Sequence, residues 1–393
     1  MKARHLMKLL GAVLAFTLLA AACADGDDDS ETTEGTAATA QPAAASSDTG
    51  DASDDEPDVG ADDGPAAAEP DDESPADTVA PEEPAEDEPP PEPRRIAYLS
   101  ASSANTFLLA SVGEMQRLAD ENNIEIVEFD AQFNAELQTT QLQDVIASGK
   151  YDGIILVALN GPGLVPDVEA ALAGGMQVVL FNQIVGADLS TNEPQVDGIA
   201  ASVLAPPVVT GERAGRLTIQ ACEGLDPCRV VYFFGIRGIP LDVALRQGFD
   251  SVVVDHPSIQ VVAEGEGQYL GPERGINAIQ DILQVQPEFD VVVGADQSLQ
   301  GVELVLTEEG MLGDVALIGL GGSSPAVEGV RDGRWFATVF YAPASEGRLA
   351  MEAMIAALAD GTITGGVDPN AGFLDEGLVT SANVDQFTAE WDG

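Results

Sequence analysis

The chain has few basic side chains. Lysine and arginine number 16 in 393 residues against 67 aspartates and glutamates, which gives a formal net charge of -51. Proteins bind nucleic acid largely by neutralising phosphates with lysine and arginine, and anionic membrane surfaces attract the same residues. The charge therefore argues against nucleic acid as a partner, and against a purely electrostatic contact with an anionic membrane.

Histidine and cysteine are also scarce, with two and three copies. After the first residues one histidine remains, His256, and its expected place in a turn favours a solvated side chain over a catalytic base. The sequence has no G-x-S-x-G elbow, no H-E-x-x-H pair and no Walker-type phosphate loop. Asp242 and Asp296 could form an acid–base pair, but such pairs arise by chance in so acidic a chain. We therefore expect no catalytic residue, no metal ion and no cofactor.

Residues 1–23 have the organisation of a signal peptide. A basic stretch precedes an apolar run at 9–22 that is too short to span a bilayer comfortably. The run ends in Leu-Ala-Ala-Ala-Cys, which resembles the lipobox of bacterial lipoproteins, where the cysteine is lipidated and becomes the mature N-terminus. An ordinary cleaved signal peptide with a chance cysteine is the alternative. We expect lipid on Cys23 and an extracytoplasmic, membrane-anchored protein.

Residues 24–93 differ from the rest of the chain in composition. They contain 25 of the 67 acidic residues and 11 of the 24 prolines, with no basic and no aromatic residue. Such a segment has little to bury and repels itself, so it is predicted to be disordered. A flexible chain of this length spans roughly 50 Å. We expect a solvated tether between the lipid and a folded part.

From Arg95 onward, short apolar runs alternate with segments of helical spacing. This alternation predicts parallel sheets covered by helices on both faces, and because it occurs twice we expect two doubly wound α/β units. The expected strands are 96–100, 124–129, 153–158, 177–181, 229–234, 259–264, 291–294, 315–319, 335–341 and 377–382. The expected helices are 107–122, 138–148, 165–173, 209–221, 241–254, 272–283, 299–309, 326–331 and 346–359.

Cys222 and Cys228 lie close together between an expected helix and an expected strand. In an exported chain such a pair most simply forms a disulfide. Two free thiols or a redox pair are the alternatives, although the spacing is not that of the C-x-x-C redox motif.

Short segments of distinctive sequence follow several expected strands or open several expected helices. They are S-A-S-S-A-N-T-F at 100–107, F-D-A-Q-F-N at 129–134, G-E-R-A-G at 211–215, L-R-Q-G-F at 245–249, A-D-Q at 295–297, I-G-L-G-G at 318–322 and G-V-R-D-G at 329–333. In order and spacing they resemble the type I periplasmic sugar-binding family, the ribose-binding-protein-like receptors of ABC importers. The resemblance covers about residues 95–385 and rests on the whole set of segments.

The resemblance implies two lobes that close over a ligand about three hinge crossings, near 204–207, 341–343 and 371–374. The N-terminal lobe would comprise 94–205 and 342–372, and the C-terminal lobe 206–341 and 373–393. A monomer that hands a small sugar-like molecule to an ABC permease is the implied role. The same fold could instead present its ligand to a chemotaxis receptor or a kinase. An exported α/β enzyme is a third possibility, which lacks a visible base or metal cluster.

The resemblance also transfers candidate ligand contacts residue by residue. They are Asn105, Phe107, Asn182, Gln183, Asp242, Tyr269, Asp296 and Tyr341. The family commonly has Asp-Arg where this chain has Asn182-Gln183, and an aspartate of the family is lost at Gly319–Gly321. Arg237 and Arg246 lie near the second-lobe candidates. Because sugars are usually held by charged groups and aromatic rings together, the loss of charge suggests a ligand that is less polar than ribose or different from it.

Overall fold

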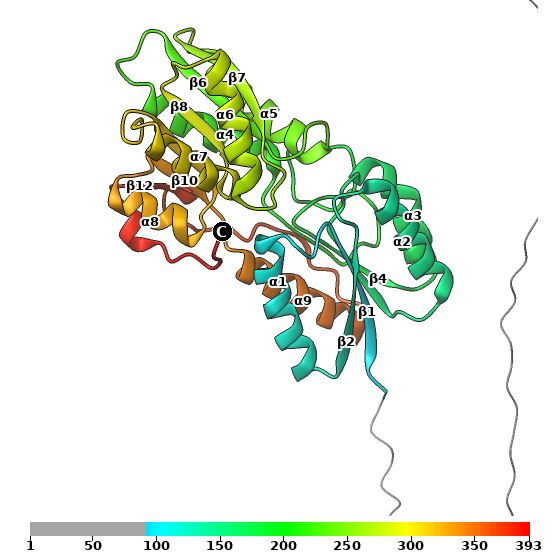
Figure 1. Cartoon of the computed structure of the whole chain (residues 1–393). Coiled ribbons are helices and arrows are strands. Elements are labelled where there is room, and N and C mark those ends of the chain that lie inside the picture. The colour runs from blue at the N-terminus through cyan, green and yellow to red at the C-terminus, as the bar shows by residue number, and fades with distance from the viewer. Residues whose placement is uncertain (1–91) are drawn as a thin grey trace, which may run out of the picture. The chain divides into compact units, whose positions relative to one another are not determined.

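A computed structural model describes residues 92–393. Within this range the chain forms two six-stranded sheets, each covered by helices on both faces, and each sheet is the centre of one lobe (Figure 1). The predicted class of two doubly wound α/β lobes is confirmed. The expected signal peptide, the lipid site at Cys23 and nearly all of the expected tether lie outside the described residues.

The first lobe is built on a sheet of order β11-β5-β4-β3-β1-β2, in which all neighbours are parallel. Its strands are β1 (Arg94–Ser100), β2 (Ile124–Asp130), β3 (Gly153–Leu156), β4 (Gln177–Phe181), β5 (Ala201–Val203) and β11 (Gly365–Val367). Its helices are α1 (Thr106–Glu121), α2 (Ala135–Ser148), α3 (Gly161–Ala173) and α9 (Pro343–Asp360). The sequence did not predict β5 and β11, because each has three residues and β11 begins with two glycines, which have little strand propensity.

The second lobe is built on a sheet of order β12-β10-β9-β8-β6-β7. Its strands are β6 (Cys228–Phe234), β7 (Ile259–Glu266), β8 (Val291–Ala295), β9 (Ala316–Gly321), β10 (Ala337–Phe340) and β12 (Leu378–Thr380). Its helices are α4 (Pro207–Ala221), α5 (Pro240–Val253), α6 (Pro272–Val285), α7 (Asp296–Glu308) and α8 (Ser324–Asp332), followed by the short 3₁₀ turns η1 (Leu374–Gly377) and η2 (Val384–Gln386).

One pair of strands departs from the expected parallel arrangement. β12 runs antiparallel to β10, and Leu378 at its start pairs with Val339 near the end of β10. The reason is the route of the chain. It leaves the first lobe after β11 and reaches the second sheet on the side where the carboxyl end of β10 lies. A strand that starts at that edge must run in the opposite direction.

The central strands are buried on both faces, which explains their unbroken apolar sequence. In β1, Ile96 and Tyr98 pack with α1 and α9, whereas Leu99 packs with α2 and α3. In β6, Phe233 packs with α6, α7 and α8, whereas Tyr232 packs with α4 and α5. Strands of parallel sheets that are covered on both sides have this composition.

The chain passes between the lobes three times, after β5, after β10 and after β11. Cys222 at the C-terminal end of α4 lies beside Cys228 at the start of β6, with Cα atoms 5.6 Å apart, a separation that suits a disulfide. No helix in the described part of the chain is long and apolar enough to cross a membrane.

Candidate functional site

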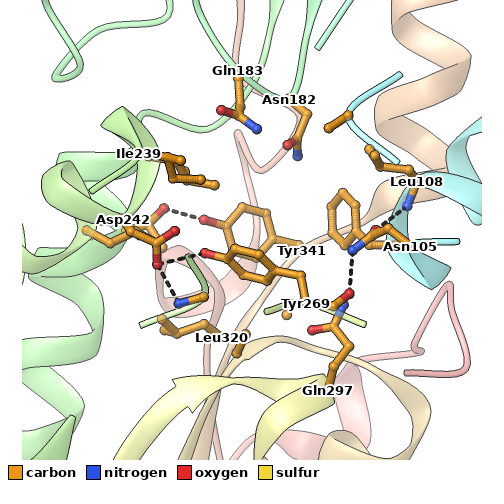
Figure 2. A pocket seen from close by; sticks show the side chains of 18 of the residues that line it. Asn105, Leu108, Asn182, Gln183, Ile239, Asp242, Tyr269, Gln297, Leu320 and Tyr341 are labelled. Carbon is orange, nitrogen blue, oxygen red and sulfur yellow. Dashed lines mark hydrogen bonds between the residues drawn. The ribbon is translucent and has the colours of Figure 1, made fainter. Parts of the chain in front are cut away.

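A cavity of about 110 Å³ lies between the lobes, where the carboxyl ends of the strands of both sheets face each other (Figure 2). In doubly wound sheets this edge is the usual place for ligands. The volume is well above the roughly 10–15 Å³ that one water molecule needs. The cavity can therefore accept a small organic molecule.

Seven of the eight predicted contact residues line this cavity. They are Asn105, Phe107, Asn182, Gln183, Asp242, Tyr269 and Tyr341. The eighth, Asp296, is fully buried beside the lining residues Ala295 and Gln297 and does not reach the cavity. Its carboxylate accepts a hydrogen bond of 2.7 Å from the backbone N–H of Ser323, so it holds the loop after β9 in place. Burial raises the pKa of Asp296 to about 6.

Asn105 connects the two lobes. It is the N-cap of α1, and its Oδ1 accepts a hydrogen bond of 2.9 Å from the backbone N–H of Leu108. Its Nδ2 donates a hydrogen bond of 2.9 Å to the carbonyl oxygen of Tyr269 in the second lobe. The capping bond fixes the orientation of the amide. The lobes are therefore in direct contact across the cleft through a buried side chain.

Aromatic rings from both lobes form the walls. The ring of Phe107 on α1 lies edge-on to Tyr341, with 6.0 Å between ring centroids, and edge-on to Trp391 at 5.4 Å. Phe133 of the first lobe lies 6.2 Å from Tyr269 of the second. The hydroxyl of Tyr341 donates a 2.6 Å hydrogen bond to Thr210. Such rings offer flat apolar surfaces with polar edges, which suits molecules that have one apolar face.

Among residues 92–393, Asp242 is the only lining residue with a carboxylate, and none of the lining residues in this range is a lysine or an arginine. Its carboxylate accepts hydrogen bonds from the backbone N–H groups of Gly235 (2.5 Å) and Ile236 (3.0 Å) and from the hydroxyl of Tyr269 (3.1 Å). Burial raises the pKa of Asp242 to about 6, although these donors oppose the rise. Asp242 therefore acts first as the group that holds Tyr269 against the loop after β6.

We predict that Tyr269→Phe lowers the free energy of unfolding by about 1 kcal/mol, because the buried carboxylate of Asp242 loses one of its donors. Urea denaturation at pH 7.5 measures the change. Tyr151→Phe is the matched control, since Tyr151 contacts Phe129 and Arg95 through its ring. Equal stability of Tyr269→Phe and the control would show that the Tyr269 hydroxyl does not support Asp242.

Asn182 and Gln183 follow β4 and present amides to the cavity (Figure 2). Asn182 adopts a left-handed backbone conformation with φ of 63°, which asparagine tolerates better than most residues. Behind it, Glu346 in the first turn of α9 is 2% exposed. Burial raises the pKa of Glu346 to about 8, and hydrogen bonding by Asn182 partly opposes the rise. At neutral pH this carboxyl is therefore mostly uncharged.

Arg237 and Arg246 do not line the cavity. Their guanidinium groups bind Glu264 at 2.8 Å and 2.5 Å, and Arg237 also lies over the ring of Phe234. No group of three or more histidine, cysteine, aspartate or glutamate side chains within residues 92–393 is placed to hold a metal ion. The cavity thus offers amides, hydroxyls and aromatic rings, with little charge.

Several lining residues were not predicted, among them Phe133, Thr210, Ile239, Gln297, Leu320 and Trp391. Gln297 could have been found, because it ends the segment A-D-Q at 295–297 and is the second residue of α7. Trp391 could not, because it lies beyond residue 385, where the sequence resemblance ends.

A family model for the periplasmic binding protein domain matches residues 96–362. Among curated proteins, the ribose import binding protein of Bacillus subtilis is 24% identical over 257 residues, which cover 65% of this chain and 79% of the relative. The ribose import binding protein of Salmonella typhimurium is 23% identical over 259 residues, covering 65% and 82%. Sequence similarity therefore extends over most of the folded part.

Solved structures show the same fold as this chain. A solute-binding protein of an ABC transporter from Mycobacterium smegmatis, with bound glycerol, superimposes with a TM-score of 0.64 at 25% identity, covering 77% of this chain and 99% of that one. A galactofuranose-binding protein superimposes with a TM-score of 0.65 at 18% identity, covering 75% and 97%. With the two lobes, the three crossings and the family match over most of the described residues, the chain belongs to the periplasmic binding protein family.

Proposed function

We propose that this protein is an extracytoplasmic solute-binding protein that captures a neutral, sugar-like molecule between its lobes and delivers it to an ABC importer. The observation that carries the proposal is the composition of the cavity wall, which combines amides and hydroxyls with aromatic rings from both lobes. Family membership implies a location outside the cytoplasm. Ligand would favour the closed arrangement through contacts to both lobes that exist only there.

The charge of the ligand follows from the lining. Phosphates and carboxylates are normally held by arginine or lysine, and neither is among the described residues that line this cavity. An organic cation would need a free carboxylate, whereas the carboxylate of Asp242 already accepts three hydrogen bonds. A neutral molecule with several hydroxyl groups and one apolar face fits best. Ribose, for which two relatives are named, and myo-inositol and D-allose, which are bound in two solved structures, are molecules of this class.

Further features of the exported protein belong to the same proposal. Lipid on Cys23 would anchor the chain, and residues 24–93 would hold the lobes away from the membrane. The Cys222–Cys228 pair would be oxidised outside the cytoplasm, where disulfides persist. The protein would act as a monomer and would bind its ligand without converting it, as membership of the periplasmic binding protein family implies.

We expect at least one neutral member of a panel of D-ribose, D-allose, D-arabinose, myo-inositol and glycerol to raise the melting temperature of the purified protein. Ligand at about 100 times its Kd stabilises by about 2.7 kcal/mol, which corresponds to about 4 °C for a folded part of about 300 residues. D-ribose 5-phosphate is the matched anionic control. A larger shift with the phosphate than with D-ribose, or no shift with any neutral member, would contradict the proposal.

A further inference from the structure

The segment 388–393, which we call the strap, is attached to the second lobe. Trp391 in the strap is 4% exposed. Its indole Nε1–H donates a hydrogen bond of 3.0 Å to the carbonyl oxygen of Gly321 at the end of β9. Its own carbonyl oxygen accepts hydrogen bonds from the backbone N–H (2.9 Å) and the hydroxyl (3.0 Å) of Ser324, the first residue of α8. The strap is therefore fixed to the second lobe and moves with it.

The glycine-rich loop after β9 makes room for the strap. A Cβ atom at Gly321 would lie 2.6 Å from Cζ2 of Trp391, and Gly321 has a φ of 156°, a conformation that side chains disfavour. The sequence alone suggested only that this loop permits a close backbone approach. The group that approaches is the indole of Trp391, so the loop and the strap form one structure.

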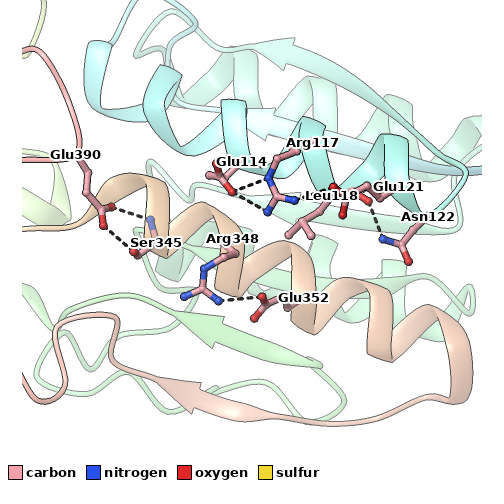
Figure 3. Close-up of polar contacts among 9 residues, drawn as sticks. All are labelled: Glu114, Arg117, Leu118, Glu121, Asn122, Ser345, Arg348, Glu352 and Glu390. Atoms are coloured by element: carbon pink, nitrogen blue, oxygen red, sulfur yellow. Dashed lines mark hydrogen bonds and ion pairs between the residues drawn. The ribbon is translucent and has the colours of Figure 1, made fainter.

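The strap also binds the first lobe, at the N-terminus of α9. The residue before this helix is Ala342, whose side chain has no oxygen that could accept a hydrogen bond from the first turn. Glu390 of the strap supplies the acceptor. Its carboxylate accepts hydrogen bonds from the backbone N–H (2.8 Å) and the hydroxyl (2.7 Å) of Ser345, as Figure 3 shows. A carboxylate is favourable there because helix N-termini carry unpaired N–H groups and a partial positive charge.

A second contact of the strap with the first lobe lies on α1. The ring of Trp391 is edge-on to Phe107, with 5.4 Å between ring centroids, so the two rings touch each other directly. Helices α1 and α9 are themselves in backbone contact, because a Cβ atom at Gly347 would lie 2.2 Å from the carbonyl oxygen of Ser111. Since α1 and α9 form one body in the first lobe, the strap connects the lobes independently of the three crossings of the chain.

We propose that the strap holds the lobes in their closed arrangement, with Glu390 bound to the first turn of α9 only while the lobes are closed. This inference rests on the proposed function and deepens it by naming what regulates the same site. Ser345 lies shortly after the crossing expected at 341–343, so rotation of the lobes turns its N–H away from Glu390. Hydrogen bonds weaken steeply when they are bent. By favouring the closed arrangement, the strap raises the affinity for any solute that the cavity accepts.

Glu390→Ala tests the strap, because it removes the acceptor of both hydrogen bonds with Ser345. Neither residue is among the described residues that line the cavity, so a change in affinity reports on closure. Of D-ribose, D-allose, D-arabinose, myo-inositol and glycerol, each one that the wild-type protein binds should bind Glu390→Ala at least about fivefold more weakly in isothermal titration, by the same factor for all. Faster dissociation in stopped-flow measurements should account for most of the loss.

Two further variants make the result specific. Asp392→Ala is the matched control, because it removes an exposed carboxylate from the same strap, and it should leave every affinity unchanged. Ser345→Ala removes the hydroxyl but keeps the backbone N–H, so it should weaken binding less than Glu390→Ala does. Adding Ser345→Ala to Glu390→Ala should have no further effect, because the hydroxyl has then already lost its acceptor.

Sedimentation velocity of the purified protein supplies a measurement that needs no ligand. Open lobes have more friction than closed ones, so ligand-free Glu390→Ala should sediment more slowly than Asp392→Ala. A strap that only caps α9 would lower the urea midpoint of Glu390→Ala without changing its sedimentation or its dissociation rate.

The outcomes separate this inference from the function on which it rests. If the wild-type protein binds none of the neutral panel, the proposed function fails, and slower sedimentation of Glu390→Ala than of Asp392→Ala still supports the strap. If the wild-type protein binds a panel member and Glu390→Ala binds it as tightly as Asp392→Ala does, the role of the strap is overturned while the proposed function stands. Equal sedimentation of the two ligand-free variants overturns it whether or not a ligand is found.

Discussion

Gly248→Ala is expected to destabilise the second lobe by about 3 kcal/mol or more, although it adds a single methyl group. Gly248 lies in α5 where this helix crosses α4, and an added Cβ would overlap the carbonyl oxygen of Val208. The facing glycine, Gly211 in α4, has the same relation to the carbonyl oxygen of Leu245. Both clashes are with backbone atoms, so no side-chain rotation relieves them and the helices must move apart.

The matched control is Gly113→Ala, which makes the same change at a glycine inside a helix. Gly113 lies on the exposed side of α1, and an added Cβ would meet no atom within 4 Å. Alanine is favoured over glycine in a helix by about 0.5–1 kcal/mol, so this variant should be more stable than the wild type. Urea denaturation followed by circular dichroism measures both variants. A loss below 1 kcal/mol for Gly248→Ala would mean that α4 and α5 are not in backbone contact.

The sequence identifies the segments that contain these glycines but does not show which glycines are required. The segments 211–215 and 245–249 contributed to the family resemblance without a physical reason for their composition. The structure supplies the reason, because Gly211 and Gly248 allow two helix backbones to touch. Within the sequence, Gly113 and Gly248 look alike, since both lie in amphipathic helices. Only the neighbouring backbone, which comes from a distant part of the chain, distinguishes a required glycine from a replaceable one.

The difference between local sequence and contacts with distant parts of the chain also explains which site residues could be predicted. Asn105, Asn182 and Asp242 follow strands of a parallel sheet, and the carboxyl edge of such a sheet gathers these loops at one place. The residue-by-residue resemblance to the family was sufficient to predict that they lie there. Asp296 also follows a strand, but it is the first residue of α7 and its side chain turns to the loop of Ser323 instead of the cavity. Trp391 reaches the site through a segment that follows the last strand, so its position depends on tertiary contacts alone.

Glu346→Gln is expected to stabilise the protein at alkaline pH and to remove most of the pH dependence of stability between pH 6 and 8. Glu346 is buried in the first turn of α9, and its Oε2 has no hydrogen-bond partner within the described range 92–393. Burial raises its pKa from 4.5 to about 8, Asp368 and Glu390 add to the rise, and Asn182 opposes it. Tyr98 and Tyr341 also lie in its electrostatic surroundings, and they stay neutral because burial raises their pKa values.

The sign of the effect follows from proton linkage. Above pH 4.5 the unfolded chain releases the proton of Glu346, whereas the folded protein keeps it until about pH 8. The folded state thus binds more protons over this interval, and stability falls as the pH rises from about 4.5 to about 8. Asp242 and Asp296, with pKa values raised to about 6, add to the fall at the acidic end of this range. For Glu346 the shift corresponds to at most about 5 kcal/mol at pH 9.

Glutamine has the shape of the protonated acid and cannot ionise, so Glu346→Gln should have a nearly constant urea midpoint from pH 6 to 9, while the wild-type midpoint falls. Glu352→Gln on the same helix is the control, because Glu352 is 47% exposed and pairs with Arg348, so it should keep the wild-type profile. If Glu346→Gln retains the full slope, the buried carboxyl is not the titrating group. If the slope is lost, Glu346 is uncharged at neutral pH, and the amide of Asn182 that lines the cavity has no negative charge behind it. The absence of this negative charge behind the cavity disfavours a cationic solute and leaves Asp242 as the lining carboxylate among the described residues.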